Sequence, residues 1–239
     1  MTMIYEWPLD WYKATAATFY LQSRSQSSSR PWLGGKSVYG PHAQIWVCKM
    51  TISEQEWDGR GQAMSAFFSR LDGQAGLMRI GHVARLIPQW DRVTATTVQP
   101  WSDGTFFDDG TGWESGTLPP LVHVAEAASR GARYIVVGGL PVSSSRVLRR
   151  GDLFEIRPNG VASESPNLYE VQFDAPTNSS GATGIEIRPA LRQSIAAGDT
   201  IVLRNPTSVF RVVDDDQGAV EVTPPMRSNF GFTLVEAIV

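Results

Sequence analysis

The feature that most constrains the fold is a run of short segments between Leu148 and Leu203 in which apolar and polar residues alternate. Gly, Pro, Asn or Ser separates each segment from the next, and these residues are typical of turns. A period of two is the pattern of a half-buried strand. In one segment the apolar face comprises Tyr169, Val171 and Phe173, and the polar face comprises Glu170, Gln172 and Asp174. The stretch therefore predicts a compact antiparallel barrel or sandwich made of hairpins.

Two Gly-Asp pairs, Gly151-Asp152 and Gly198-Asp199, stand where a predicted turn passes into a predicted strand. Glycine permits a positive φ, and an aspartate side chain can bond the local backbone. Both pairs are therefore expected to form tight turns.

The residues on either side of this stretch predict a second unit. Gln44 to Ile52 is the clearest early strand, and a helix is expected where Met64, Phe67, Phe68 and Leu71 share one face, with Gly73 closing it. Further strands are expected at 14–25, 77–86, 134–137, 209–213, 219–223 and 230–239. We predict one domain from residues 1–85 together with 206–239, and an inserted domain at 86–205.

Composition excludes several classes of protein. The formal net charge is −3, so no basic field is available to attract nucleic acid or an anionic membrane. Cys48 is the single cysteine, which excludes intramolecular disulfides, and it is expected to be a small buried residue. No apolar run approaches the roughly 20 residues that span a bilayer, and the N-terminus lacks a signal-peptide core, so export by that route is not expected.

No catalytic or metal-binding constellation is found. Gly35-Lys36-Ser37 lacks the first glycine of a phosphate-binding loop, since position 30 is Arg30. The acidic segment 103–110 does not fit the calcium-loop pattern, and the three histidines have no paired spacing. The run Asp214 to Asp216 is expected to be a solvated turn. We predict no enzyme activity, no cofactor and no metal.

The order of elements resembles that of the distal tail proteins of long-tailed bacteriophages and related gene transfer particles. The resemblance covers most of the chain as a series and rests on no single diagnostic motif. Its pieces are 44–52, the Phe-rich helix running into 71–76, 124–131, 151–156, 168–171, 187–192, 209–212 and 232–238.

This resemblance implies a tail-tube-like β-barrel or sandwich with one packed helix, interrupted by a barrel similar to the oligonucleotide/oligosaccharide-binding fold. It also implies a strand from Val124 to Ala128, where helix propensity competes. Such proteins form a six-fold ring in the virion, assembled in the bacterial host cytoplasm. The ring joins the tail tube on one face to the tip or baseplate hub on the other. The expected partners are therefore copies of this chain, a tail-tube protein and a hub protein.

Two long segments are candidates for contacts with such partners. Ser23 to Tyr39 is polar and carries positive charge, and we predict an arm that orders against the neighbouring subunit or the tube ring. Residues 88–120 hold tryptophans, which are enriched at binding hot spots. A free solvated loop and aromatics packed on their own domain are the alternatives. The candidate interface residues are Arg24, Arg30, Trp32, Lys36, Trp90, Trp101 and Trp113.

One alternative function is a carbohydrate-binding module of a tail tip, with a cell-surface glycan as its partner. Exposed tryptophans would favour it, because indole faces stack on sugars. An enzyme of unknown type is the weaker alternative, for want of a catalytic constellation.

Overall fold

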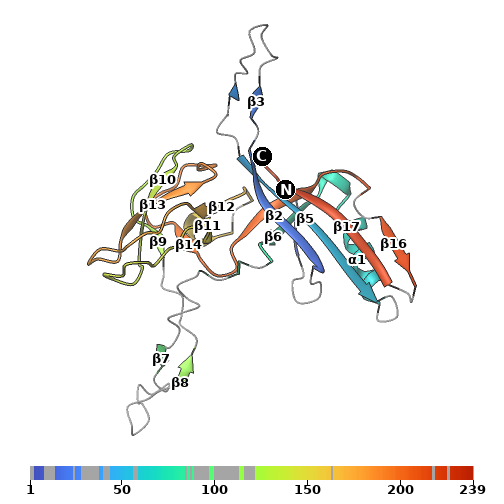
Figure 1. Cartoon of the computed structure of the whole chain (residues 1–239), viewed down its shortest axis with the longest axis horizontal. Coiled ribbons are helices and arrows are strands. Elements are labelled where there is room, and N and C mark those ends of the chain that lie inside the picture. The colour runs from blue at the N-terminus through green and yellow to red at the C-terminus, as the bar shows by residue number, and fades with distance from the viewer. Residues whose placement is uncertain are drawn as a thin grey trace.

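The computed structural model describes residues 3–7, 14–23, 25–27, 38–39, 44–55, 59–83, 85–86, 88, 97–99, 113–115, 122–162, 164–216, 219–224 and 227–238. Within these residues the protein is mainly β, with one α-helix, a closed six-stranded barrel and a separate mixed sheet. The predicted mainly-β class, with a barrel and one packed helix, is therefore confirmed. Figure 1 shows the barrel on the left and the sheet on the right.

The larger sheet has seven strands, which come from both ends of the described chain. Its order is β1 (Ile4–Glu6), β6 (Leu77–Gly81), β15 (Thr207–Val212), β17 (Arg227–Glu236), β5 (Gln44–Gln55) and β2 (Ala16–Ser23), and β16 (Val220–Thr223) also pairs with β17. The β1–β6 pair is parallel and every other pair in this sheet is antiparallel. The strands predicted near 14–25, 44–52, 77–86, 209–213, 219–223 and 230–239 all belong to it.

The helix α1 (Arg60–Arg70) covers one face of this sheet (Figure 1). Met64 and Phe68 are buried, Leu71 is buried directly after the helix, and Phe67 packs edge-on against the Trp7 ring. The predicted apolar stripe is thus core. The helix ends slightly before the predicted residue: Asp72 has φ 52 and Gly73, which opens the 3₁₀ turn η2 (Gly73–Ala75), has φ 62.

The barrel closes in the order β10 (Tyr134–Gly138), β13 (Thr183–Arg188), β12 (Leu168–Val171), β11 (Leu153–Arg157), β14 (Thr200–Val202) and β9 (His123–Val124). A short 3₁₀ turn, η3 (Pro158–Gly160), follows β11. The inward side chains form one core that includes Phe154, Tyr169 and Ile187. Tyr169 and Val171, which begin the apolar face read from the sequence, therefore point into the barrel.

Both predicted Gly-Asp turns are confirmed, and they are built alike. Gly151 has φ 86 and Gly198 has φ 94, the left-handed region in which a side chain is strained. Asp152 Oδ2 accepts a hydrogen bond of 2.9 Å from the Arg149 backbone N–H. Asp199 Oδ2 accepts one of 2.9 Å from the Ala196 backbone N–H, again three residues earlier.

Two local predictions on the barrel are wrong. Phe173 is 66% exposed, because β12 ends at Val171 and the alternation no longer sets the direction of its side chain. The strand expected from Val124 to Ala128 is reduced to His123–Val124, followed by a bend and a single bridge between Ala128 and Ile195. Neighbouring strands, rather than local preference, decided where pairing stops.

Two short antiparallel pairs lie outside the main sheets. In β3 (Gln26–Ser27) and β4 (Val38–Tyr39), Gln26 pairs with Tyr39; in β7 (Thr97–Gln99) and β8 (Trp113–Ser115), Gln99 pairs with Trp113. Figure 1 shows the first pair above the body and the second below it.

The barrel strands lie between residues 123 and 202, and the strands of the larger sheet lie within 4–81 and 207–236. The division into 1–85 with 206–239 and 86–205 also claims that each part folds by itself. That claim stays a prediction, which cooperative unfolding of an 86–205 fragment would measure.

Candidate functional site

Most of the sequence-predicted interface residues lie outside the described residues: Arg24, Arg30, Trp32, Lys36, Trp90 and Trp101. The Trp113 backbone belongs to β8, but its side chain is not described. The described part of the predicted arm, β3 and β4, lies beyond the ends of β2 and β5, so the arm begins as an extension of that hairpin. Whether these residues contact a partner stays a prediction.

Strand β2 is the open edge of the larger sheet among the described residues. Its eight residues pair with β5 from Ala16–Thr51 to Ser23–Gln44, and no pairing with its other side is formed by the described strands. The segment, Ala-Ala-Thr-Phe-Tyr-Leu-Gln-Ser, contains no charge and no proline. Edge strands usually carry charged residues or proline, which prevent pairing with a strand of another chain. Neither protection is present within Ala16–Ser23.

The Phe19 side chain packs β2 against the core of the sheet. The Phe19 ring centroid lies 5.3 Å from that of Trp46 and 5.8 Å from that of Phe210. The His82 ring lies 4.8 Å from Phe19, and its Nδ1 accepts a 3.1 Å hydrogen bond from the Arg85 backbone N–H. Burial, and then the charge of Arg85, lower the pKa of His82 to about 4. Phe19 of the edge strand therefore packs against two aromatic rings and an uncharged imidazole.

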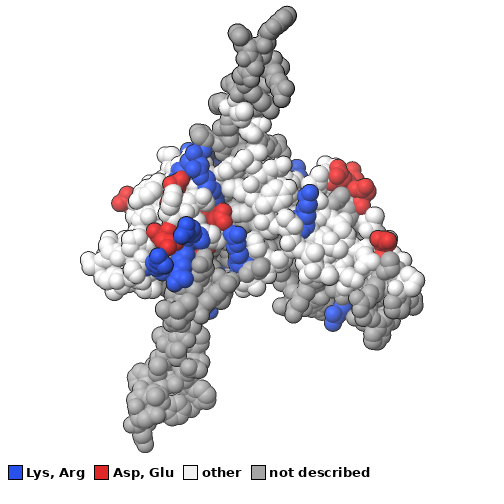
Figure 2. Space-filling view, viewed as in Figure 1, with Lys and Arg blue, Asp and Glu red and all other residues white. Residues whose placement is uncertain are grey.

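The sheet face opposite α1 has a polar part and an apolar part on β2, β5 and β17. Thr18, Lys49, Thr51, Gly231 and Thr233 form the polar part, along a shallow hollow of about 290 Å³. Tyr20, Ile45 and Val47 continue the same face, and Ile45 and Val47 are each 5% exposed. In Figure 2 the surface over these strands is mostly uncharged. The polar part of this face suits contact with water better than burial in a core.

The barrel is joined to the sheet by a buried polar junction. Glu236 of β17 is 3% exposed, and its Oε2 accepts hydrogen bonds from Arg192 Nη2 at 2.6 Å and from the Trp46 backbone N–H at 3.2 Å. Arg192, which follows β13, also donates to the Gln44 carbonyl. Burial raises the pKa of Glu236, while Arg192 and the Trp46 N–H act in the opposite direction. Charge neutralisation thus ties a barrel loop to two sheet strands.

Two more hydrogen bonds reinforce this contact. The Trp46 indole N–H donates to the Leu168 carbonyl at 2.9 Å, and the Arg192 backbone N–H donates to Tyr169 Oη at 3.1 Å. Burial raises the pKa of Tyr169 to about 12, so its hydroxyl stays protonated. Leu153 and Leu168 of the barrel belong to the apolar core beneath α1.

A second buried carboxylate crosses the junction from the barrel side. Glu155 of β11 is 1% exposed and binds Arg157 through both oxygens, at 2.8 and 3.0 Å. Its Oε2 accepts from the Thr207 backbone N–H and hydroxyl, both at 3.0 Å, and Arg79 Nη1 lies 3.8 Å from its Oε1. Each unit therefore places a carboxylate among donors of the other, which fixes their relative orientation.

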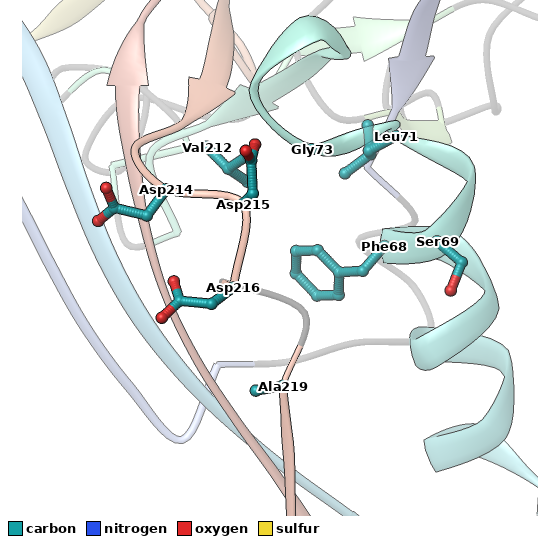
Figure 3. Close-up of a pocket in the computed structure, with 9 residues that line it drawn as sticks. All are labelled: Phe68, Ser69, Leu71, Gly73, Val212, Asp214, Asp215, Asp216 and Ala219. Atoms are coloured by element: carbon teal, nitrogen blue, oxygen red, sulfur yellow. The ribbon is translucent and has the colours of Figure 1, made fainter.

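The acidic turn after β15 lines a hollow of about 430 Å³ (Figure 3). Phe68, Leu71 and Val212 form its apolar side, and Asp214, Asp215 and Asp216 are exposed around it. Asp215 Oδ1 accepts a 3.0 Å hydrogen bond from the Gln74 backbone N–H. The exposed turn agrees with the sequence prediction, and Asp215 has a structural task in stabilising η2.

The described residues offer little to catalysis. Among them, no group of three or more His, Cys, Asp or Glu side chains is placed to hold a metal ion. Cys48 is fully buried, as predicted, and burial raises its pKa to about 12, so its thiol is not an activated nucleophile. No helix in the described part of the chain is long and apolar enough to cross a membrane.

Sequence reasoning missed both the open edge and the junction. The uncharged composition of β2 was visible in the sequence, but nothing in the sequence indicated which strand would lie at the edge. Glu155 and Glu236 occur at positions of apolar alternation, Glu155 beside Phe154 and Ile156, and Glu236 beside Val235 and Ala237. A carboxylate within an apolar-alternating run is the one sequence signal that could have identified Glu155 and Glu236 as buried junction residues.

No protein-family model matches this sequence, and no curated protein matches it.

Proposed function

We propose that this chain is a non-enzymatic structural protein whose copies assemble head to tail into a closed ring. The observation that carries the proposal is β2: an eight-residue strand without charge, at the sheet edge and unpaired on its outer side among the described strands. Backbone N–H and C=O groups on such an edge pair readily with a strand of another chain.

The opposite side of the same sheet supplies an unlike edge. Strands β1 and β16 lie there, so pairing β2 of one copy with that side of the next would continue the sheet from subunit to subunit. Contacts between unlike patches form a ring when the rotation between copies closes. The polar part of the face of β2, β5 and β17, with Thr18, Lys49 and Thr51, suits the wall of a water-filled channel.

The resemblance to distal tail proteins extends this proposal. It assigns six copies to the ring and places the ring at the distal end of a phage-type tail. The tail-tube protein would lie on one face and the tip hub on the other. The buried junction supports this role, because a barrel held in one orientation on the sheet can hold a neighbouring protein in a fixed position relative to the ring.

The test uses intact particles, since ring formation can depend on the rest of the tail. The double variant Thr18→Lys/Gln22→Lys places two charges on the exposed edge, where lysine prevents strand pairing. We expect it to fold but to be missing from purified particles. The matched control, Val142→Lys/Val161→Lys, adds the same charge at exposed barrel positions and should be incorporated normally.

Electron microscopy with labelled copies then locates the protein. Label confined to the distal end of the tail is expected. Label along the tube shaft, or absence of the native chain from the particle, would refute the tail assignment. Normal incorporation of the edge variant would refute the role of β2.

A further inference from the structure

The barrel presents one aromatic ring in an unusual setting. Tyr134 of β10 is 61% exposed, yet its phenol lies directly against the backbone of Gly184 on the neighbouring strand β13. A Cβ atom at Gly184 would overlap the Tyr134 hydroxyl and ring. The glycine thus leaves room for the hydroxyl end of the ring over β13, while most of the side chain faces solvent.

Polar side chains lie on the same outer face of the barrel as this ring. Glu186 stands opposite Tyr134 in the β10–β13 ladder, and it forms a 3.1 Å ion pair with Arg188. The backbone N–H of Gln172 donates to the Glu186 carbonyl at 3.0 Å, which places Gln172 on the far side of Glu186. The surface therefore combines a fixed aromatic face with carboxylate, guanidinium and amide groups.

The charges of this surface balance. Glu170 stands opposite Arg188 in the β12–β13 ladder, and Arg85 Nη1 lies 2.7 Å from Glu170 Oε1. Two carboxylates and two guanidinium groups thus offset each other. A nucleotide would need an excess of positive charge for its phosphate, so base stacking in a nucleic acid is disfavoured here.

We infer that Tyr134 is the stacking platform of a glycan-binding site, and that its ligand is an uncharged hexopyranose unit. The apolar C–H face of such a sugar covers the open side of the ring, and its equatorial hydroxyls reach Glu186, Arg188 and Gln172. This site does not depend on ring assembly, and it is distinct from the tryptophans expected from the sequence. An aromatic ring over a strand glycine also stabilises a sheet, and the experiment separates that role from binding.

The experiment follows the backbone amide resonances of the full-length isotope-labelled protein by NMR. The probes are the methyl β-glycosides of glucose, galactose and N-acetylglucosamine, with adenosine monophosphate as the nucleotide arm. Saturable shifts at Tyr134, Gly184 and Glu186 with at least one glycoside are expected. An absence of shifts at these amides with all three glycosides, or a stronger response to the nucleotide, overturns the inference.

Four variants separate binding from packing. Tyr134→Phe keeps the ring and should bind normally, whereas Tyr134→Ala should weaken binding up to about tenfold, the upper range for one aromatic contact. Gly184→Ala retains the tyrosine but tilts its ring, and should weaken binding as well. Phe173→Ala removes an equally exposed aromatic with no glycine beneath it, and should leave binding unchanged. Binding that survives Tyr134→Ala assigns the tyrosine a purely structural role and overturns the inference.

The outcome is independent of the proposed ring. Normal incorporation of Tyr134→Ala into particles is expected in either case. Lost glycoside binding with normal rings concerns this site alone, and absent rings with normal binding concern the assembly alone.

Discussion

The barrel and the seven-stranded sheet differ in what happens to the backbone donors and acceptors at their strand edges. Every barrel strand has a neighbour on both sides, so its backbone donors and acceptors are used within the subunit. The sheet, built from comparable strands, ends at β2, which no described strand covers. A closed sheet removes its edges, whereas an open one has to protect or use them. The difference teaches that stability is concentrated in the barrel and its junction, while the capacity for assembly lies at the open edge.

The largest effect on stability is expected at the junction. Glu155→Ala removes the acceptor of Arg157 and of the Thr207 N–H and hydroxyl, leaving part-buried donors unpaired. A loss of about 3–5 kcal/mol in the free energy of unfolding is expected, as for other broken buried pairs. The matched control is Glu186→Ala, which removes a partly exposed carboxylate from a barrel ion pair and should cost less than about 1 kcal/mol. Equal losses in urea denaturation would contradict the distinction between junction and surface.

The second prediction concerns Arg192→Met, which leaves Glu236 buried without its guanidinium partner. At alkaline pH the cost should approach roughly 3–5 kcal/mol. Burial raises the pKa of Glu236 above its usual 4.5, so the folded state binds the proton more tightly than the unfolded state. The free energy of unfolding therefore falls as pH rises from 4.5 through the raised value.

Losing Arg192 removes an influence that lowers this pKa, so the total fall should be larger in Arg192→Met and should continue to higher pH. The double variant Arg192→Met/Glu236→Gln has no carboxyl at this position, and its stability should lack this component. Denaturation at mildly acidic and mildly alkaline pH tests both. A cost of Arg192→Met that is independent of pH would mean that the charge of Glu236 is not involved.

A smaller effect is expected at the barrel turns. Gly198 has φ 94, and an added Cβ would meet nothing within 4 Å, so Gly198→Ala tests backbone strain alone. A loss of about 1–2 kcal/mol is expected. Gly231 on β17 is equally open but has no positive φ, so Gly231→Ala should be neutral or stabilise by up to about 1 kcal/mol. Thermal unfolding that ranks the two variants in the opposite order would refute the strain argument.

The smallest effect on stability is expected at the open edge. Thr18→Lys/Gln22→Lys changes exposed side chains without disturbing Phe19 or Leu21, so each change should alter stability by no more than about 0.5 kcal/mol. Chemical denaturation of the isolated chain measures this change in the free energy of unfolding. A loss as large as that of Glu155→Ala would show that β2 stabilises the subunit itself, and would remove the contrast between edge and junction.

The sequence by itself determined the features that depend on neighbours in the chain. The period-two segments formed strands, the stripe of Met64 and Phe68 formed the buried face of a helix, and the two Gly-Asp pairs formed matching turns. Each of these follows from local geometry: side-chain direction along a strand or helix, and the freedom of glycine at positive φ.

The tertiary structure alone decided which strands close into a barrel, which strand is left at an edge, and which carboxylates are buried. Glu236 meets Trp46 across 190 positions of sequence, and Glu155 meets Thr207 across 52. Phe173 continues a correct alternation yet points to solvent, because the strand ends two residues earlier. Pairing over such separations depends on the whole set of competing contacts, and local patterns contain no record of the partner.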